Sequence, residues 1–193
     1  MARKKIEFRP DPSGSGLLSK LYITPGQRRT ILKWTLYSLL CVAVLVVQDV
    51  ILSRLRLFGA VVDLTPCVIM LVCVLEGAQN GSVFTLAASV FYLYSGSAPG
   101  AYCIVLLTVS AVVAAVFRQN FLRRGFSAHW LCTVGATFVY QFGVFVMGLF
   151  LAQTHPGRVG TFGMNALLAA VVLPAVYPAF EAIGKIGGET WKE

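Results

Sequence analysis

The stretch from Gln48 to Asp63, QDVILSRLRLFGAVVD, separates the first two long apolar runs of the chain. It gathers two carboxylates, one carboxamide and two arginines within sixteen residues of a sequence that otherwise avoids charge: Gln48, Asp49, Arg54, Arg56 and Asp63. Charged side chains between apolar runs mark the point where a chain leaves the bilayer and enters it again. We therefore predict an external turn here between two membrane helices.

The composition predicts an integral membrane protein. Of the 193 residues, 57% are hydrophobic and 12% are charged, which is about half the charged share of a soluble domain. The formal net charge is +8, but the basic residues flank apolar runs, where they orient membrane helices. We expect no nucleic-acid partner. We also expect no secretory signal peptide, because the first thirty residues contain no apolar core followed by a cleavage site.

The apolar runs predict an all-α membrane protein with six short transmembrane helices in one domain, residues 31–186. A basic, partly disordered cytoplasmic tail (1–30) is expected before it and a short cytoplasmic tail (187–193) after it. The spans are expected at residues 31–52, 61–75, 82–94, 101–117, 130–151 and 162–183.

The second and third spans are expected to be short. As one helix, residues 61–95 would be about 50 Å long, which is more than a bilayer requires. The polar, glycine-bearing segment from Glu76 to Gly81 predicts a turn in the middle. Two short spans then imply a thinner bilayer or burial behind neighbouring helices. A re-entrant hairpin is the alternative.

The distribution of basic residues predicts the orientation. With six spans both termini lie on one side, together with thirteen of the sixteen lysines and arginines, while Arg54, Arg56 and Arg158 lie on the other. Because cytoplasmic loops are enriched in basic residues, we expect cytoplasmic termini.

The chain shows no pattern of catalytic or metal-binding residues, so we expect no enzyme, cofactor or metal site. Both histidines, His129 and His155, are expected in loops, and the acidic residues near span ends, where charge costs least. The five cysteines lie in or at the start of apolar runs, without metal-ligand spacing, and are expected in the core or against lipid.

Polar and small side chains form stripes on several predicted helices. Ser82, Thr85, Ser89 and Tyr92 share one face of the third span, and Thr133, Thr137, Tyr140 and Gln141 one face of the fifth. We interpret these stripes as helix–helix contacts inside the bundle, with a ligand cavity as the alternative. Pro174 and Pro178 predict a kinked sixth span.

Several of these features resemble the rod shape-determining protein MreD family of bacteria. The resemblance covers residues 33–186. Around the external segment it rests on Gln48 at the end of the first span, the segment RLRLFG (54–59) and Asp63 at the start of the second span. The glycine-bearing turn after the second span also fits. In the last span it rests on Asn165 near the start and on Pro174 with Tyr177-Pro178 near the end. Val62 and Tyr92 depart from the family pattern, standing where it has proline and aspartate.

The resemblance implies a non-enzymatic scaffold of the cell-elongation complex in the bacterial inner membrane. Its partner would be the single-span, coiled-coil protein MreC. Through this partner the scaffold would link MreB filaments to the glycosyltransferase RodA and its transpeptidase. The family is also similar in fold to the substrate-binding subunits of energy-coupling-factor vitamin transporters.

Two hypotheses follow for the external segment. As a scaffold, the protein would bind its partner through Gln48, Asp49, Arg54, Arg56, Phe58, Asp63, Asn165 and Pro174. As the binding subunit of a vitamin transporter, it would instead hold a small molecule at the outer side through Gln48, Tyr92, Tyr140 and Gln141. The first span has only one alanine, Ala43, and therefore lacks the A-x-x-x-A pattern with which such subunits engage their transporter. A further hypothesis is that the basic tail attracts anionic lipid, with contact to a cytoplasmic filament as the alternative.

Overall fold

A computed structural model describes residues 25–54, 56–57, 60–122 and 125–186. These residues form six α-helices, two short 3₁₀-helices and one pair of two-residue strands. The elements in chain order are α1 (Pro25–Val50), η2 (Leu52–Arg54), β1 (Arg56–Leu57), β2 (Ala60–Val61), α2 (Leu64–Glu76), α3 (Ala78–Tyr94), α4 (Tyr102–Phe121), α5 (Phe126–Phe150), η3 (Pro156–Arg158) and α6 (Val159–Ile186).

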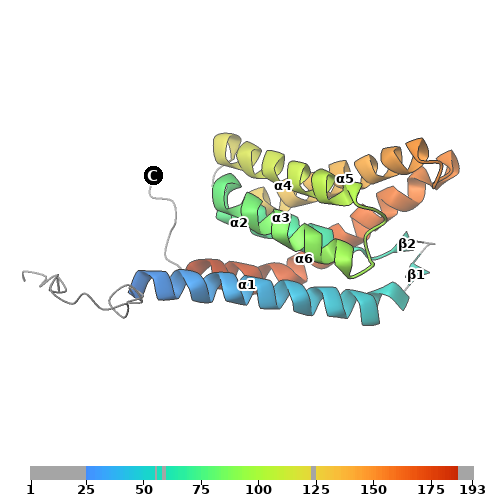
Figure 1. The fold of residues 1–193 in the computed structure, drawn as a ribbon. Coiled ribbons are helices and arrows are strands. Elements are labelled where there is room, and N and C mark those ends of the chain that lie inside the picture. The colour runs from blue at the N-terminus through green and yellow to red at the C-terminus, as the bar shows by residue number, and fades with distance from the viewer. Residues whose placement is uncertain (1–24, 55, 58–59, 123–124, 187–193) are drawn as a thin grey trace, which may run out of the picture.

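The helices form one elongated bundle with two distinct ends. Strands β1 and β2 pair antiparallel at one end, with Arg56 opposite Val61 and Leu57 opposite Ala60; we call this the strand end. The start of α1 and the end of α6 lie at the opposite end, which we call the base (Figure 1). Helices α4 and α5 run along one side of the bundle and α1 along the other, while α6 crosses from the end of α5 to the start of α1 (Figure 1).

Helix α2 lies at the centre of the bundle and contacts all five other α-helices. Its sequence, LTPCVIMLVCVLE, is apolar around its whole circumference, and twelve of its thirteen residues are buried. A helix of this kind has no face suited to solvent and must be enclosed by its neighbours. One side of α2 packs with α4 and α5 through Met70 and Val74, and the other packs with α1 and α6 through Val68 and Leu71.

A tight turn and a close backbone contact join α2 to α3. Gly77 adopts a positive φ of 90° between the two helices, a conformation that favours glycine. One turn later, a Cβ on Gly81 would lie 2.7 Å from the Cα of Cys73. The absence of a side chain at Gly81 therefore allows the two backbones to approach each other.

Four helices are long and apolar enough to cross a membrane, within α1, α4, α5 and α6, and α2 is apolar but shorter. Large hydrophobic side chains point outward from the bundle, including Leu39, Phe91 and Val171, which are 66%, 69% and 73% exposed. An outer surface this apolar suits lipid. The chain is therefore a helical, multi-pass membrane protein.

The predicted element boundaries need correction at several points. Helix α3 begins at Ala78 rather than residue 82, so the predicted turn is reduced to Gly77. Val61 lies in β2, and α2 begins only at Leu64. Helix α4 continues past Arg118 to Phe121, because a buried polar partner lets the basic side chain remain inside the bundle, as described below.

The placement of His129 in a loop was wrong. Helix α5 begins at Phe126, and the His129 amide donates to the carbonyl of Gly125. By contrast, the interior position of both polar stripes is confirmed, because Thr85, Ser89 and Tyr92 of α3 and Thr133, Thr137, Tyr140 and Gln141 of α5 are buried, although Ser82 is only half-buried. All five cysteines are buried and free.

Candidate binding site at the strand end

Gln48 joins α1 to α2 at the strand end. Its side chain is buried in the last turn of α1, and its Oε1 accepts hydrogen bonds from the Thr65 amide (2.6 Å) and the Thr65 hydroxyl (2.7 Å). The first amides of a helix have no partner within that helix. Gln48 therefore caps α2 from another helix, a task that the preceding Asp63 would ordinarily perform.

Asp63 precedes α2 but makes no side-chain cap bond. Its Oδ1 instead accepts from Gln48 Nε2 at 2.9 Å, and its Oδ2 accepts from the Tyr92 hydroxyl at 3.0 Å. Burial raises the pKa of Asp63 to about 6, although the hydrogen bonds from Tyr92 and Gln48 oppose the rise. Because Gln48 occupies the capping position, the Asp63 carboxylate is turned toward the interior of the bundle.

Asn165 links the start of α6 to the strand pair through a side-chain hydrogen bond. Its Oδ1 accepts a hydrogen bond from the Val61 amide at 3.1 Å, across 104 positions of sequence. This bond satisfies an outward-facing amide of a two-stranded pair that has no third strand in the described residues. The loop after α3 is held by a similar contact, in which the Ser97 hydroxyl donates to Asp49 Oδ1 at 2.6 Å.

These side chains surround a cavity of about 300 Å³. Its polar lining residues come from five segments of the chain: Gln48, Asp49 and Ser53, then Asp63, Ser97, Tyr140 and Gln141, and Asn165. Tyr140 is 1% exposed, and its side chain interacts with those of Cys103 and Tyr92. The cavity therefore combines the exposed carboxylate of Asp49 and the half-buried carboxylate of Asp63 with the buried side chains of Gln48, Tyr140 and Gln141.

The structure brings together four of the eight residues predicted for partner binding, namely Gln48, Asp49, Asp63 and Asn165. Arg54 is exposed in η2, beside the cavity-lining residue Ser53. Arg56 lies in β1, with its side chain outside the described part of the structure, and Phe58 lies outside the described residues. Pro174 does not belong to the site, because it lies on an exposed face in the middle of α6, more than two turns beyond Asn165.

Three of the cavity residues were anticipated for a different reason. Gln48, Tyr140 and Gln141 were predicted as ligand groups of a transport subunit, and all three line the cavity. Tyr92 reaches the same site through its bond to Asp63. Asp63 lies at the start of α2, near a span end as predicted, but its carboxylate is half-buried and bonded to Gln48 and Tyr92.

Two buried polar clusters at the base were not predicted. Lys33 Nζ lies 2.6 Å from Glu76 Oε2, with both side chains at most 4% exposed, and the Tyr37 hydroxyl donates to Glu76 Oε1 at 2.9 Å. This cluster ties α1 to the end of α2. The sequence does show one charge of each sign in the first two apolar runs, Lys33 and Glu76. It does not show that these two side chains contact each other.

The second base cluster joins α4, α5 and α6. Arg118 Nη1 lies 2.9 Å from His129 Nε2, and the Tyr177 hydroxyl lies 3.2 Å from His129 Nδ1. A histidine bonded through both ring nitrogens is fixed in orientation. His129 thus belongs to the interior packing of the bundle.

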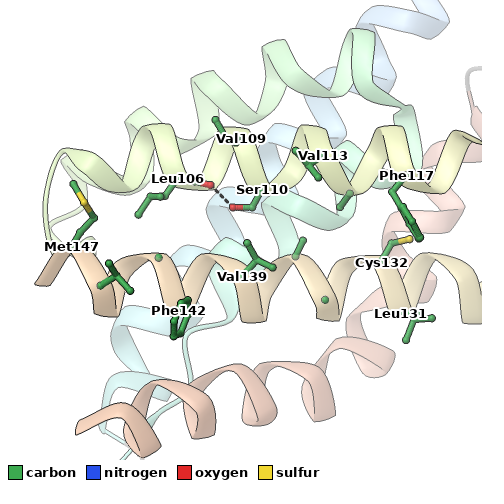
Figure 2. A pocket seen from close by; sticks show the side chains of 15 residues that line it. Leu106, Val109, Ser110, Val113, Phe117, Leu131, Cys132, Val139, Phe142 and Met147 are labelled. Carbon is green, nitrogen blue, oxygen red and sulfur yellow. Dashed lines mark hydrogen bonds between the residues drawn. The ribbon is translucent and has the colours of Figure 1, made fainter. Parts of the chain in front are cut away.

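An apolar groove of about 630 Å³ runs along the outside of the bundle between α4 and α5. Figure 2 shows its aliphatic and aromatic lining, and the Ser110 hydroxyl that bonds to the Leu106 carbonyl of its own helix. Gly135 and Gly143 also line the groove, and nothing lies within 4 Å of a Cβ placed on Gly135. The groove offers shape and apolar contact but almost no polar chemistry.

In the part of the chain that the structure describes, no three His, Cys, Asp or Glu residues are grouped so that they could hold a metal ion. Comparison of the chain with models of known protein families, with curated proteins and with solved structures finds no match.

Proposed function

We propose that this protein is a non-enzymatic scaffold subunit of the bacterial cell-elongation complex, resembling the MreD family. The observation that carries the proposal is the strand end. Gln48, Asp63 and Asn165 underlie the resemblance and are far apart in sequence, yet they line one cavity, with Gln48 bonded to Asp63. A shared arrangement of these residues would explain why all three recur in the family pattern.

The proposed topology has six spans in the inner membrane, with the strand end outside and both termini in the cytoplasm. The start of α1 and the end of α6 lie together at the base (Figure 1), as an even number of crossings requires. Arg118 and Lys185 also belong to helix ends at the base, in keeping with the positive-inside rule. The short helices α2 and α3 would cross as part of the bundle, in the manner of the six-helix vitamin-binding subunits.

The proposed partner is a single-span, coiled-coil protein like MreC, and its span would occupy the groove between α4 and α5. The groove extends over residues 131–147 of α5, about 25 Å of helix, which is close to the thickness of the hydrocarbon core. Glycines allow membrane helices to approach closely, and Gly135 leaves open space on the groove floor. MreB filaments, RodA and its transpeptidase would then be reached through the partner.

Co-purification with an MreC-like partner in mild detergent tests the scaffold. Gly135→Leu fills the groove without an internal clash, so it should reduce recovery of the partner. Gly163→Leu is the matched control, because this glycine of α6 also has nothing within 4 Å of its Cβ. Charge reversal at Arg54 and Arg56 should weaken recovery as well. Full recovery with both the groove variant and the charge-reversed variant would refute the scaffold assignment.

A second candidate function is the substrate-binding subunit of an energy-coupling-factor type vitamin transporter. One observation favours it: Gln48, Tyr140 and Gln141 line a common cavity at the proposed outer side. A vitamin retained by the purified protein would favour this function over the scaffold.

A further inference from the structure

A narrow groove lies between α1 and α3, with α2 as its floor. Both helices begin at the base and pack against α2, but they make little contact with each other. The groove has a volume of about 170 Å³ and opens toward the base into a wider hollow of about 400 Å³. The two spaces are continuous, because Phe84 and Ala87 line both. Neither space shares a lining residue with the groove between α4 and α5.

The two walls of this α1–α3 groove have the same helical spacing. Five lining residues on each helix recur at i, i+4, i+7, i+8 and i+11, which places them on one face. They are Trp34, Ser38, Cys41, Val42 and Leu45 of α1, and Asn80, Phe84, Ala87, Ala88 and Phe91 of α3. Each wall is therefore about 17 Å long, which is close to half of the ~30 Å hydrocarbon core of a bilayer. The groove thus has the depth of one leaflet.

The inside of the α1–α3 groove is apolar. The Ser38 hydroxyl donates to the Trp34 carbonyl of its own helix, and the Thr65 hydroxyl on the floor donates to Gln48. Both hydroxyl protons are therefore already used within the protein. A helix with its side chains is about 10–12 Å across, which is too wide for a space of about 170 Å³. A single hydrocarbon chain is much narrower, so a lipid acyl chain suits the groove in size and in chemistry.

The base end of the groove is polar and basic. Trp34 and the exposed Asn80 both line the wider hollow, and tryptophan is enriched at the level of the lipid headgroups. Arg28 is exposed and lies about four turns before Val42, hence on the same side of α1. An arginine beside the membrane surface attracts anionic lipid, and its guanidinium can donate two hydrogen bonds to one phosphate. The charge at this end therefore favours an anionic headgroup.

We propose that the α1–α3 groove binds one anionic phospholipid of the leaflet at the base, with an acyl chain between the two helices and the phosphate near Arg28 and Asn80. Of the four long apolar helices, α1 is the least buried, with 17% of its most apolar window inside the bundle. The lipid adds contacts where α1 has few, and it should stabilise the folded protein. This site does not depend on the proposed scaffold function or on partner docking between α4 and α5.

The test uses the full-length protein, purified in mild detergent and freed of lipid by detergent exchange. Phosphatidylglycerol should raise its melting temperature in a saturable manner, and phosphatidylcholine with the same acyl chains should raise it much less. Native mass spectrometry should show one retained phosphatidylglycerol per chain. Equal effects of the two lipids would overturn the proposal. A dimer that Ala87→Leu dissociates would also overturn it, because a second copy would then occupy the groove.

One pair of variants tests the acyl-chain site. Ala87→Leu fills the groove and should weaken phosphatidylglycerol binding about tenfold. Ala43→Leu is the matched control, because Ala43 is exposed on α1 and does not line the groove. Ser38→Leu fills the groove from the opposite wall and provides the same test if Ala87→Leu does not fold. Unchanged binding in the groove variants, or an equal loss in Ala43→Leu, would refute the assignment.

A second pair of variants tests the headgroup position. Arg28→Gln should lower the preference for phosphatidylglycerol over phosphatidylcholine about fivefold. Arg29→Gln is the matched control, because it removes the same charge from the next residue, about 100° further round the helix from Val42. It should change the preference less. An equal change in the two variants would show general attraction to the basic surface and would contradict a phosphate held near Arg28.

Discussion

Gly81→Ala is expected to destabilise the protein, although alanine is the better helix former. The new Cβ would lie 2.7 Å from the Cα and 2.9 Å from the carbonyl oxygen of Cys73. Carbon atoms make their best contacts at about 3.5–4.0 Å, so α3 would have to move by about 1 Å away from α2. Both contacts are with backbone, so no rotation of a neighbouring side chain relieves them.

The size of the effect follows from two opposing terms. Overpacking costs about 1–3 kcal/mol, and the better helix propensity of alanine offsets at most about 1 kcal/mol. We expect a net loss of about 1–2 kcal/mol, which corresponds to a melting temperature lower by roughly 2–8 °C for a chain of this length. Gly163→Ala is the control, because a Cβ there has open space, and it should leave the melting temperature unchanged or raise it.

Both variants are compared by thermal unfolding in the same detergent, with the wild-type protein measured alongside. The expected result is a lower melting temperature for Gly81→Ala and an unchanged or higher one for Gly163→Ala, although the chemical change is the same. If Gly81→Ala melts at or above the wild-type temperature, the two backbones are not in the close contact described, and the argument for α2–α3 packing fails.

Three further predictions concern the polar clusters. Replacing Lys33 with Met or Glu76 with Gln should each cost about 3–5 kcal/mol, since each leaves a buried charge unpaired, and a double-mutant cycle of unfolding free energies should show that the double variant loses less than the sum. Asp63 has a raised pKa of about 6 in the folded protein, so its contribution to stability is complete below its ordinary pKa of 3.8 and is lost as pH rises through 6. The melting temperature should therefore fall between pH 5 and pH 7 more steeply for the wild type than for Asp63→Asn, and parallel curves would contradict this assignment. Gln48→Met should lower the melting temperature markedly, because the amide of Thr65 loses its partner at a cost of about 1–3 kcal/mol, and an unchanged value would mean that another group caps α2.

Much of the fold could be predicted, because an apolar run long enough to cross a membrane forms an α-helix there, in which its backbone groups bond to one another. The six helices, the turn at Gly77 and the interior position of Thr85 and Thr137 all follow from local composition and spacing. Helix ends were harder to predict. His129 follows a basic, glycine-bearing linker that is typical of a loop, yet it lies in α5, where Arg118 and Tyr177 satisfy its ring.

The candidate site could be predicted only in part, because its chemistry depends on which residue performs which role. Asp63 before α2 has the sequence signature of a helix cap, and nothing in the sequence indicates that Gln48 takes that role instead. Similarly, Lys33 and Glu76 are 43 positions apart, and only the assembled bundle brings them together. Hydrogen bonds between residues that are far apart in the sequence leave no pattern in the local sequence.

The burial of α2 has a consequence for how the protein is made. A segment of thirteen residues is about 20 Å long, too short to be recognised as a spanning segment by itself during membrane insertion. In the folded protein α2 is in contact with all five other α-helices. Three of them, α4, α5 and α6, are synthesised after it. We therefore expect α2 to reach its final place late, after the C-terminal half of the chain has been inserted. A ribosome-bound nascent chain that ends before α6 should then leave α2 accessible to cysteine labelling at Cys67.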